Sequence, residues 1–235
     1  MATLESPQGS LDDWSSQLYR ALGADVSALR PVFTGDVFQN VSLALPGAAT
    51  KPRALIVLTH PCSMRRDGVA LRKRLLVAVV KQRTVTSDGW PVDELFDLMP
   101  LLNPDAAGGE FVAEFDNVAI LESSLLDRSK RVAVLELNGL NLLMQRFVHQ
   151  LTRVVVATSE FANATLPLYE EIDLIEDWVT YASEKGADAT ESERHCHDWL
   201  REAVGNSSRQ EMLRDPQSRS RVRRDAAGAA KALFP

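Results

Sequence analysis

Cysteine and long apolar runs are scarce in this sequence. Among 235 residues there are two cysteines, Cys62 and Cys196, too few for a disulfide framework. The longest apolar run, Leu75–Val80, has six residues, whereas a membrane-spanning helix needs about 20. The first residues show neither a basic region nor an apolar stretch, so no secretory signal is expected. We therefore expect a protein of the reducing cytoplasm that does not associate with a membrane.

Sequence motifs of the common catalytic and metal centres are also missing. There is no Gly-rich phosphate loop, no G-x-S-x-G and no H-E-x-x-H. His60 and Cys62 follow an apolar segment, and "HCH" stands at 195–197. Their spacing matches no standard zinc site. A His–Cys pair two residues apart seldom meets, because Pro61 stiffens the chain between them. We predict neither a metal nor a cofactor.

The patterning that is present indicates an α+β protein. Apolar content is 45% and charged content 25%, typical of globular proteins. Residues 10–22 are expected to form a short amphipathic helix that stops at Gly23. Residues 34–45, 54–59, 75–82, 117–123 and 130–136 are rich in strand formers, while 65–68 reads as a turn and 95–102 has no clear pattern. From Asn138 to Val155 apolar residues recur at helical spacing, which predicts one amphipathic helix packed on the strands.

The last third of the chain differs in composition. Between Glu170 and Glu202 acidic residues outnumber basic ones eleven to three, and two helices are expected there. In "YEEIDLIED" the acids are expected to form a charged, solvent-facing side of a helix. The Arg-rich segment from 214 onward is interpreted as a solvated or partner-bound tail. We divide the chain into an N-terminal helix (1–30), a central domain (31–157) and an acidic helical extension (158–235).

Positive charge is concentrated in one segment. From Arg65 to Arg83 there are seven basic residues and one acid, although the whole chain carries −6. Arginine binds phosphates through paired hydrogen bonds, so this segment favours nucleic-acid binding. A solvated loop and strand face explains the pattern equally well. The candidate binding residues are Arg65, Arg66, Arg72, Lys73, Arg74 and Arg83.

Three segments, in order, resemble one family. "TGDVFQNVSL" is similar to the opening strand of the MazF/PemK (plasmid-maintenance, type II toxin) proteins. "KPRALIVLTH" resembles their second strand, which follows a loop and an arginine, and "RLLVAVVKQ" resembles their third. Further on, the stretch from "NVAILESSLLDRSKR" to "VVV" is similar to their final strands and closing helix. The resemblance covers residues 34–156.

The resemblance implies a fold and a chemistry. It implies a small SH3-like antiparallel β-barrel with a packed C-terminal helix, here with a helix before it and a helical extension after it. Family members are commonly homodimers, are bound by antitoxins, and cleave single-stranded RNA without metal. The family arginine before the second strand matches Arg53, which would stabilise phosphate and assist proton transfer. The family threonine or serine that ends the third strand is replaced by Lys81, and His60 is the candidate substitute proton carrier.

Two functions follow from these residues. In the first, the protein is a toxin-type, metal-independent endoribonuclease that binds RNA through Arg53, His60 and Lys81. In the second, it is a catalytically inactive barrel that binds nucleic acid or protein within a bacterial or phage defence complex. The second is favoured by the departures from the family pattern at Lys81 and at Arg128, an arginine displaced from its family position. A plain structural module is the third interpretation.

Overall fold

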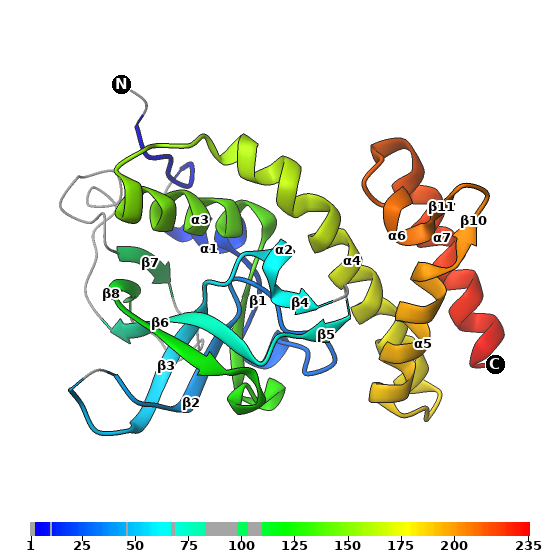
Figure 1. Cartoon of the computed structure of the whole chain (residues 1–235), viewed down its shortest axis with the longest axis horizontal. Helices are drawn as coiled ribbons and strands as arrows, with labels where there is room; N and C mark the ends of the chain where they lie inside the picture. Colours follow the sequence, from blue (N-terminus) through cyan, green and yellow to red (C-terminus); the bar gives the residue numbers. More distant parts are fainter. Residues whose placement is uncertain (1–2, 10, 46, 67–68, 83–97, 103–109) are drawn as a thin grey trace. The chain divides into compact units, whose positions relative to one another are not determined.

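The computed structural model describes residues 3–9, 11–45, 47–66, 69–82, 98–102 and 110–235 (Figure 1). The chain is divided into two compact units. The first contains residues 1–27 and 32–165, and the second contains 28–31 and 166–235. None of the described helices combines the length and the apolar character that crossing a membrane requires. The chain is α+β, as the sequence predicts.

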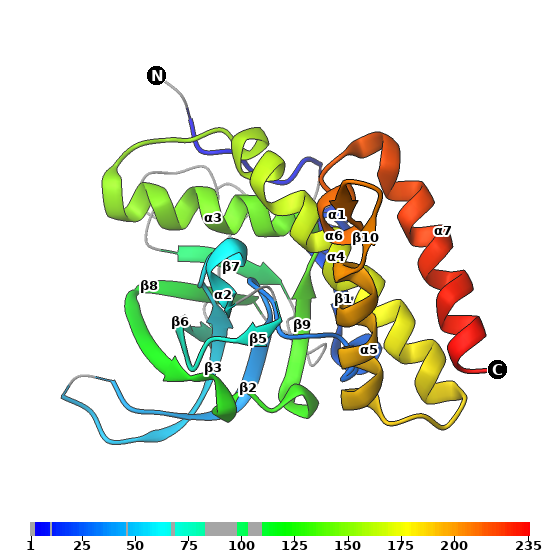
Figure 2. The same ribbon diagram turned by 45° about the vertical axis from the view of Figure 1, so that its right-hand side comes forward.

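The first unit is built on a seven-stranded antiparallel sheet with the order β1-β9-β2-β3-β6-β8-β7. Figure 2 shows that the sheet curves strongly. In the described part of the chain the pairing ends at β1 on one edge and at β7 on the other. Its strands are β1 (Tyr19–Leu22), β2 (Val37–Leu43), β3 (Lys51–Val57), β6 (Arg74–Gln82), β7 (Leu98–Leu102), β8 (Glu110–Glu122) and β9 (Arg131–Leu135).

The centre of the sheet is buried on both faces. Residues 55–58, at the end of β3 and just beyond it, are all buried, as are residues 77–80 of β6. A strand covered on both sides reads as a continuous apolar run, which is why the sequence revealed these two strands so clearly. Beside them lie the short helix α2 (Pro61–Met64) and the two-residue strands β4 (Arg65–Arg66) and β5 (Ala70–Leu71). Arg65 therefore lies in a strand, and not in the turn expected over 65–68.

The N-terminal helix is shorter than predicted. Helix α1 (Leu11–Leu18) is present, but Tyr19–Leu22 forms β1 and pairs with β9, with Tyr19 opposite Leu135. Helical periodicity continued to Leu22 in the sequence, but backbone pairing with β9 competes with the last turn of the helix. A 3-10 turn, η1 (Gly23–Asp25), follows the strand.

Helix α3 (Leu137–Thr152) packs against α1 and the sheet, and its residues 139–147 are all buried (Figure 1). Gly139 allows the close approach to α1, because a Cβ there would lie 2.3 Å from the backbone oxygen of Leu18. The helix ends at Arg153, which has a left-handed φ of 60°. It therefore stops before Val155, the predicted end. Two 3-10 turns, η4 (Ser123–Leu125) and η5 (Arg128–Lys130), separate β8 from β9.

The second unit is helical. Helix α4 begins in the first unit, and from Leu166 onward it belongs to the second. A two-residue turn with Gly205 at φ 70° joins the two short strands that follow α5. The elements are α4 (Thr158–Glu184), α5 (Ala189–Arg201), β10 (Ala203–Val204), β11 (Ser207–Ser208), α6 (Arg209–Met212) and α7 (Pro216–Leu233).

Two expectations for the second unit are wrong. Glu171 and Asp173 are buried, not solvent-facing, because Arg30 and Gln210 bind them. The Arg-rich segment is no solvated tail; most of it forms α7, with Asp215 as its N-cap. Its small apolar residues, such as Ala226, are buried, so the helix can pack although it lacks large apolar residues.

The buried ion pair between Arg131 and Asp36 ties β9 to the start of β2. Arg131 Nη1 lies 2.6 Å from Asp36 Oδ2, with side-chain exposures of 0% and 1%, and the same oxygen accepts a bond from the Phe33 N–H. Asp36→Ala would leave the guanidinium buried without its carboxylate. We expect it to lower the free energy of unfolding by about 3–5 kcal/mol in urea titrations. In contrast, Glu122→Gln at the exposed pair with Arg74 should cost less than about 1 kcal/mol. Equal losses would contradict this prediction.

Candidate functional site

Arg53 and Lys81 lie at the same end of two neighbouring strands. The register of β3 and β6 places Ala54 opposite Val80, so Arg53 and Lys81 occupy the next positions along the two strands. Residues opposite each other in an antiparallel pair project from the same face. The structure therefore brings together two of the three candidate catalytic residues.

A bulge in β8 adds a carboxylate to this strand end. Val79 is opposite Glu114 while Ala78 is opposite Val118, so one step along β6 matches four steps along β8. Bulges of this kind re-aim side chains and are frequent beside active sites. Glu114 Oε2 lies 2.6 Å from Lys81 Nζ and accepts a bond of 2.7 Å from Asn117 Nδ2.

Glu114 is held in place and still reachable from solvent. Its side chain is 19% exposed and that of Lys81 is 49% exposed. Both of its hydrogen bonds go to Oε2, so within the described chain Oε1 has no partner. Arg53 is half-buried, and its Nε is buried without a hydrogen-bond partner among the described residues. Two cations and one oriented carboxylate can together bind a phosphate and accept a proton. We call Arg53, Lys81 and Glu114 the strand-end site.

His60 lies away from the strand-end site. From Arg53 to Val57 the strand extends by about 13 Å, and His60 follows three residues later as the N-cap of α2. Its Nδ1 accepts a hydrogen bond of 3.2 Å from the backbone N–H of Cys62, which leaves the proton of the neutral ring on Nε2. Burial lowers the pKa of His60 below its usual value. His60 contacts the backbone N–H of Cys62 and not its thiol, so the contact gives no support for an activated thiol.

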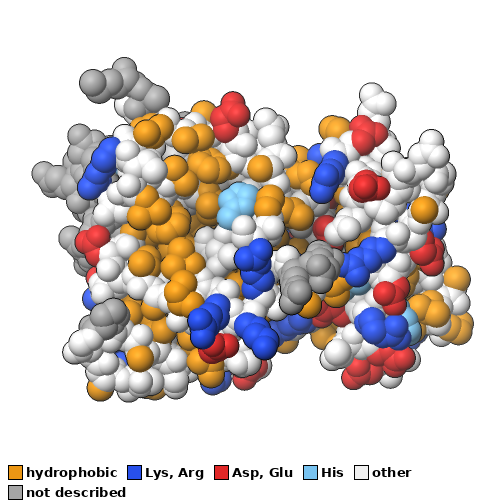
Figure 3. Space-filling model, in the orientation of Figure 1, with side chains coloured by type: hydrophobic (Ala, Val, Ile, Leu, Met, Phe, Trp, Pro, Cys, Tyr) orange, Lys and Arg blue, Asp and Glu red, His pale blue; other side chains and the backbone are white. Residues whose placement is uncertain are grey.

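The basic surface, which we define as Arg65, Arg72, Lys73 and Arg74, lies next to His60. The N–H of Arg72 donates to the oxygen of Met64, the last residue of α2. Arg72, Lys73 and Arg74 are exposed, whereas Arg65 is half-buried and donates to the oxygen of Val32. Figure 3 shows Lys and Arg side chains gathered in the part of the surface that Figure 1 assigns to β4, β5 and β6. The side chain of Arg66 and the whole of Arg83 lie outside the described residues.

The basic surface and the strand-end site are separate. Arg74 begins β6 and Lys81 lies seven residues later, which is about 23 Å of extended strand. Because side chains alternate between the two faces, Arg74 and Lys81 also project from opposite faces of β6. The sequence did not reveal Glu114 or Asn117, since the only local hint was a turn-rich segment before them.

The remaining histidines and cysteine do not form a metal centre in the described part of the chain, where no group of three or more suitable ligands occurs. Cys196 is buried in α5, and burial raises the pKa of its thiol well above the usual value, with smaller contributions from Glu171 and Glu193. Such a thiol is unreactive. His195 contacts the ring of Phe234 and the guanidinium of Arg194.

No model of a known protein family matches the chain, and no curated protein is significantly similar to it in sequence.

The lowered pKa of His60 gives a stability prediction. The unfolded chain binds a proton at this residue more readily than the folded chain, so stability should fall as pH drops through about 6.5 toward the folded pKa. His60→Asn keeps an N-cap residue but cannot titrate. In urea titrations, we expect the difference in the free energy of unfolding, wild type minus variant, to become smaller as the pH is lowered from 7.5 to 5. A difference that stays constant with pH would refute the prediction.

Proposed function

We propose that the first unit is a divergent MazF/PemK-like, SH3-like barrel that binds single-stranded RNA and cleaves it without a metal at the strand-end site. The arrangement of elements supports this proposal. The three segments that resemble the family form β2, β3 and β6, which are neighbours in the sheet in that order. The segment that resembles the closing helix forms α3, which follows β9 directly.

The observation that carries the proposal is the contact between Lys81 and Glu114, next to the position that the strand register gives Arg53. Arg53 and Lys81 occupy the positions that match the family's catalytic arginine and its threonine or serine. Glu114 supplies the base that the resemblance alone did not provide, and its contact of 2.6 Å with Lys81 gives the site both a proton acceptor and a proton donor.

The proposed reaction is an internal transfer within RNA. Glu114 accepts the proton of the 2′-hydroxyl, and the 2′-oxygen forms a bond to the neighbouring phosphorus. The bond to the 5′-oxygen breaks, and this oxygen takes a proton from the Lys81 ammonium. The products are a 2′,3′-cyclic phosphate and a 5′-hydroxyl. Arg53 stabilises the negative charge on the phosphorane, and the proton then passes from Glu114 to Lys81 to restore the site.

The basic surface would bind a more distant part of the same RNA. It is exposed and rich in arginine, and its affinity for phosphate should depend on salt. Because it lies at the other end of β6, only a long RNA can reach both sites. Its role is therefore to increase affinity for long RNA, not to take part in cleavage.

A second candidate function is RNA binding without cleavage, within a larger complex or in a dimer. The ion pair between Lys81 and Glu114 favours it, because each charge partly neutralises the other and His60, the candidate proton carrier, lies away from the strand end. An antitoxin or another protein partner is compatible with either function. Cleavage and binding assays on the same variants separate the two functions.

The role of the strand-end site is tested by Glu114→Gln and Arg53→Ala. With a labelled RNA in EDTA, each is expected to reduce the cleavage rate by about 100-fold or more, because a proton acceptor or a fixed cation is removed. RNA binding by Glu114→Gln should remain. Glu122→Gln, an exposed acid on the same strand, is the matched control and should cleave like wild type. Wild type that binds RNA but leaves it intact would support the second candidate and overturn the cleavage proposal.

The role of the basic surface is tested by changing Arg72, Lys73 and Arg74 together to alanine. Fluorescence anisotropy at several salt concentrations should show weaker binding of a 30-nucleotide RNA. The slope of log affinity against log salt should fall by about 0.7 for each phosphate that the variant no longer neutralises. Affinity for a dinucleotide should change little, because an RNA of that length cannot extend from the strand-end site over the roughly 23 Å to the basic surface. Lys130→Ala, an exposed cation elsewhere in the unit, is the control; an equal effect from it would show that the surface has no special role.

A further inference from the structure

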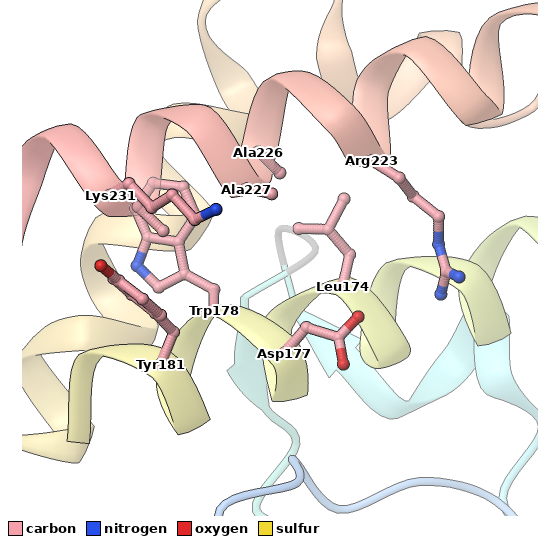
Figure 4. A pocket seen from close by; sticks show the side chains of 9 residues that line it. Leu174, Asp177, Trp178, Tyr181, Arg223, Ala226, Ala227 and Lys231 are labelled. Carbon is pink, nitrogen blue, oxygen red and sulfur yellow. The ribbon is translucent and has the colours of Figure 1, made fainter. Parts of the chain in front are cut away.

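Helix α7 has a buried side and an exposed side. Val222, Ala226 and Ala230 are buried. Figure 4 shows part of this side, where alanines of α7 and Arg223 line a pocket against α4, and Arg223 is directed toward α4. Its guanidinium lies 3.0 Å from the carboxylate of Glu170. The positive charge on the inner side of α7 is therefore paired within the second unit.

The exposed side of α7 carries a row of cations. Arg221, Arg224, Gly228 and Lys231 are all exposed. Their spacing of three, four and three residues places them on one face of the helix. From Arg221 to Lys231 this face extends for about 15 Å along the helix axis. We call these four residues the α7 row.

The charge of the α7 row is only weakly compensated. Arg221 lies 3.7 Å from Asp225, and the two side chains are 58% and 53% exposed, so water screens this pair. Arg224 and Lys231 have no ion pair among the described residues. Asp177 of α4 lines the pocket that Lys231 also borders. The three cations of the row still outnumber these acids, so the row presents positive charge to solvent.

The glycine in the α7 row has no role in packing within the described chain. Glycine inside a helix is less stable than alanine, and it is used where another group must come close to the backbone. Gly139 of α3 is such a case, because a Cβ there would lie 2.3 Å from the oxygen of Leu18. A Cβ at Gly228 would meet nothing within 4 Å among the described residues. A molecule that approaches α7 closely from outside would give this glycine the same use.

The composition of the exposed side indicates the class of this molecule. Between residues 217 and 232 the only exposed apolar residues are Ala227 and Ala232. Protein interfaces are centred on large apolar or aromatic anchors, and single-stranded nucleic acids stack their bases on aromatic side chains. A helix that lies on a membrane needs its apolar side free, but this side of α7 is buried. Interfaces with duplex nucleic acid are polar and strongly positive, and most of their contacts go to the backbone.

We propose that the α7 row binds the phosphate backbone of duplex nucleic acid. Arg221, Arg224 and Lys231 donate hydrogen bonds to phosphate oxygens. Gly228 lets the sugar–phosphate backbone come close to the helix between Arg224 and Lys231. DNA and RNA duplexes share this chemistry. The site lies in the second unit and does not depend on binding or cleavage of single-stranded RNA by the first unit.

The test compares binding of a 20-base-pair duplex, as DNA and as RNA, with binding of a 30-nucleotide single-stranded RNA. Fluorescence anisotropy is measured on the full-length protein at several salt concentrations. Changing Arg221, Arg224 and Lys231 together to alanine should weaken binding of the preferred duplex at least tenfold. For DNA the slope of log affinity against log salt should fall by about 0.9 for each phosphate contact that is lost. Affinity for the single-stranded RNA should change less than twofold.

Three further variants serve as controls. Changing Lys185, Arg194 and Arg201 together to alanine removes the same charge from exposed positions of α4, its C-terminal end and α5. This variant should bind the duplex within twofold of wild type. The alanine variant of the basic surface in the first unit should lose affinity for single-stranded RNA and keep its affinity for the duplex.

The third variant, Gly228→Gln, separates binding from folding. Glutamine is a better helix former than glycine, so the melting temperature should rise or stay the same. The added side chain occupies the space that we assign to the nucleic-acid backbone, so duplex binding should weaken at least threefold. Thermal unfolding of every variant checks that it is folded.

Each alternative result would overturn the proposal. Wild type that binds neither duplex in 50 mM salt has no such site. Equal losses in the two triple-alanine variants of the second unit would show an effect of net charge alone, and normal binding by Gly228→Gln would show that no backbone approaches this face. Competition by polyglutamate as effective as that by the duplex would assign the row to an acidic protein. A larger loss for single-stranded RNA than for the duplex would assign it to single strands.

Discussion

Antiparallel pairing between β3, β6 and β8 determines where Arg53, Lys81, Glu114 and Arg74 lie. An extended strand advances about 3.3 Å per residue and alternates its faces. Arg53 and Lys81 are therefore neighbours, whereas Arg74 lies far from them and on the other face. This pairing therefore separates the strand-end site from the basic surface, although Arg74 and Lys81 belong to one strand. A one-residue change of register would turn Lys81 away from Glu114.

The bulge in β8 is the second determinant of the strand-end site. The bulge adds residues to β8 between Val118, which is opposite Ala78, and Glu114, which is opposite Val79. In a strand without these extra residues, Glu114 would not be opposite Val79. Asn117 lies within the bulge and binds the same carboxylate oxygen as Lys81, so the irregular segment both positions Glu114 and fixes its orientation. A regular strand could carry the carboxylate of Glu114, but it would not place Asn117 to donate a hydrogen bond to it.

Residues with a strong local pattern were predictable from the sequence, and residues that depend on distant partners were not. The strands β3 and β6 were evident as continuous apolar runs, and the helix α3 was evident because its apolar residues recur at helical spacing. The strand β1 was missed because Tyr19–Leu22 continues a helical pattern, and only pairing with β9 reveals its conformation. Arg53 and Lys81 were identified through the family resemblance. Glu114 was missed because its contact with Lys81 arises from a bulge in β8 and from a residue on another strand.

Local charge was a poor guide to the surface of the second unit. The acids of α4 suggested a solvated face, but Arg30 is 1% exposed and lies 2.6 Å from both Asp173 and Glu176. Burial of an arginine requires compensation of this kind, since an unpaired buried charge is strongly unfavourable. Arg223 shares Asp173 with Arg30, so the acids nearest the start of α7 are committed to holding the unit together. Lys231, two turns further along α7, has no such acid among the described residues. The pairing of Arg223 therefore depends on which acids of α4 face it, and not on the net charge of the segment.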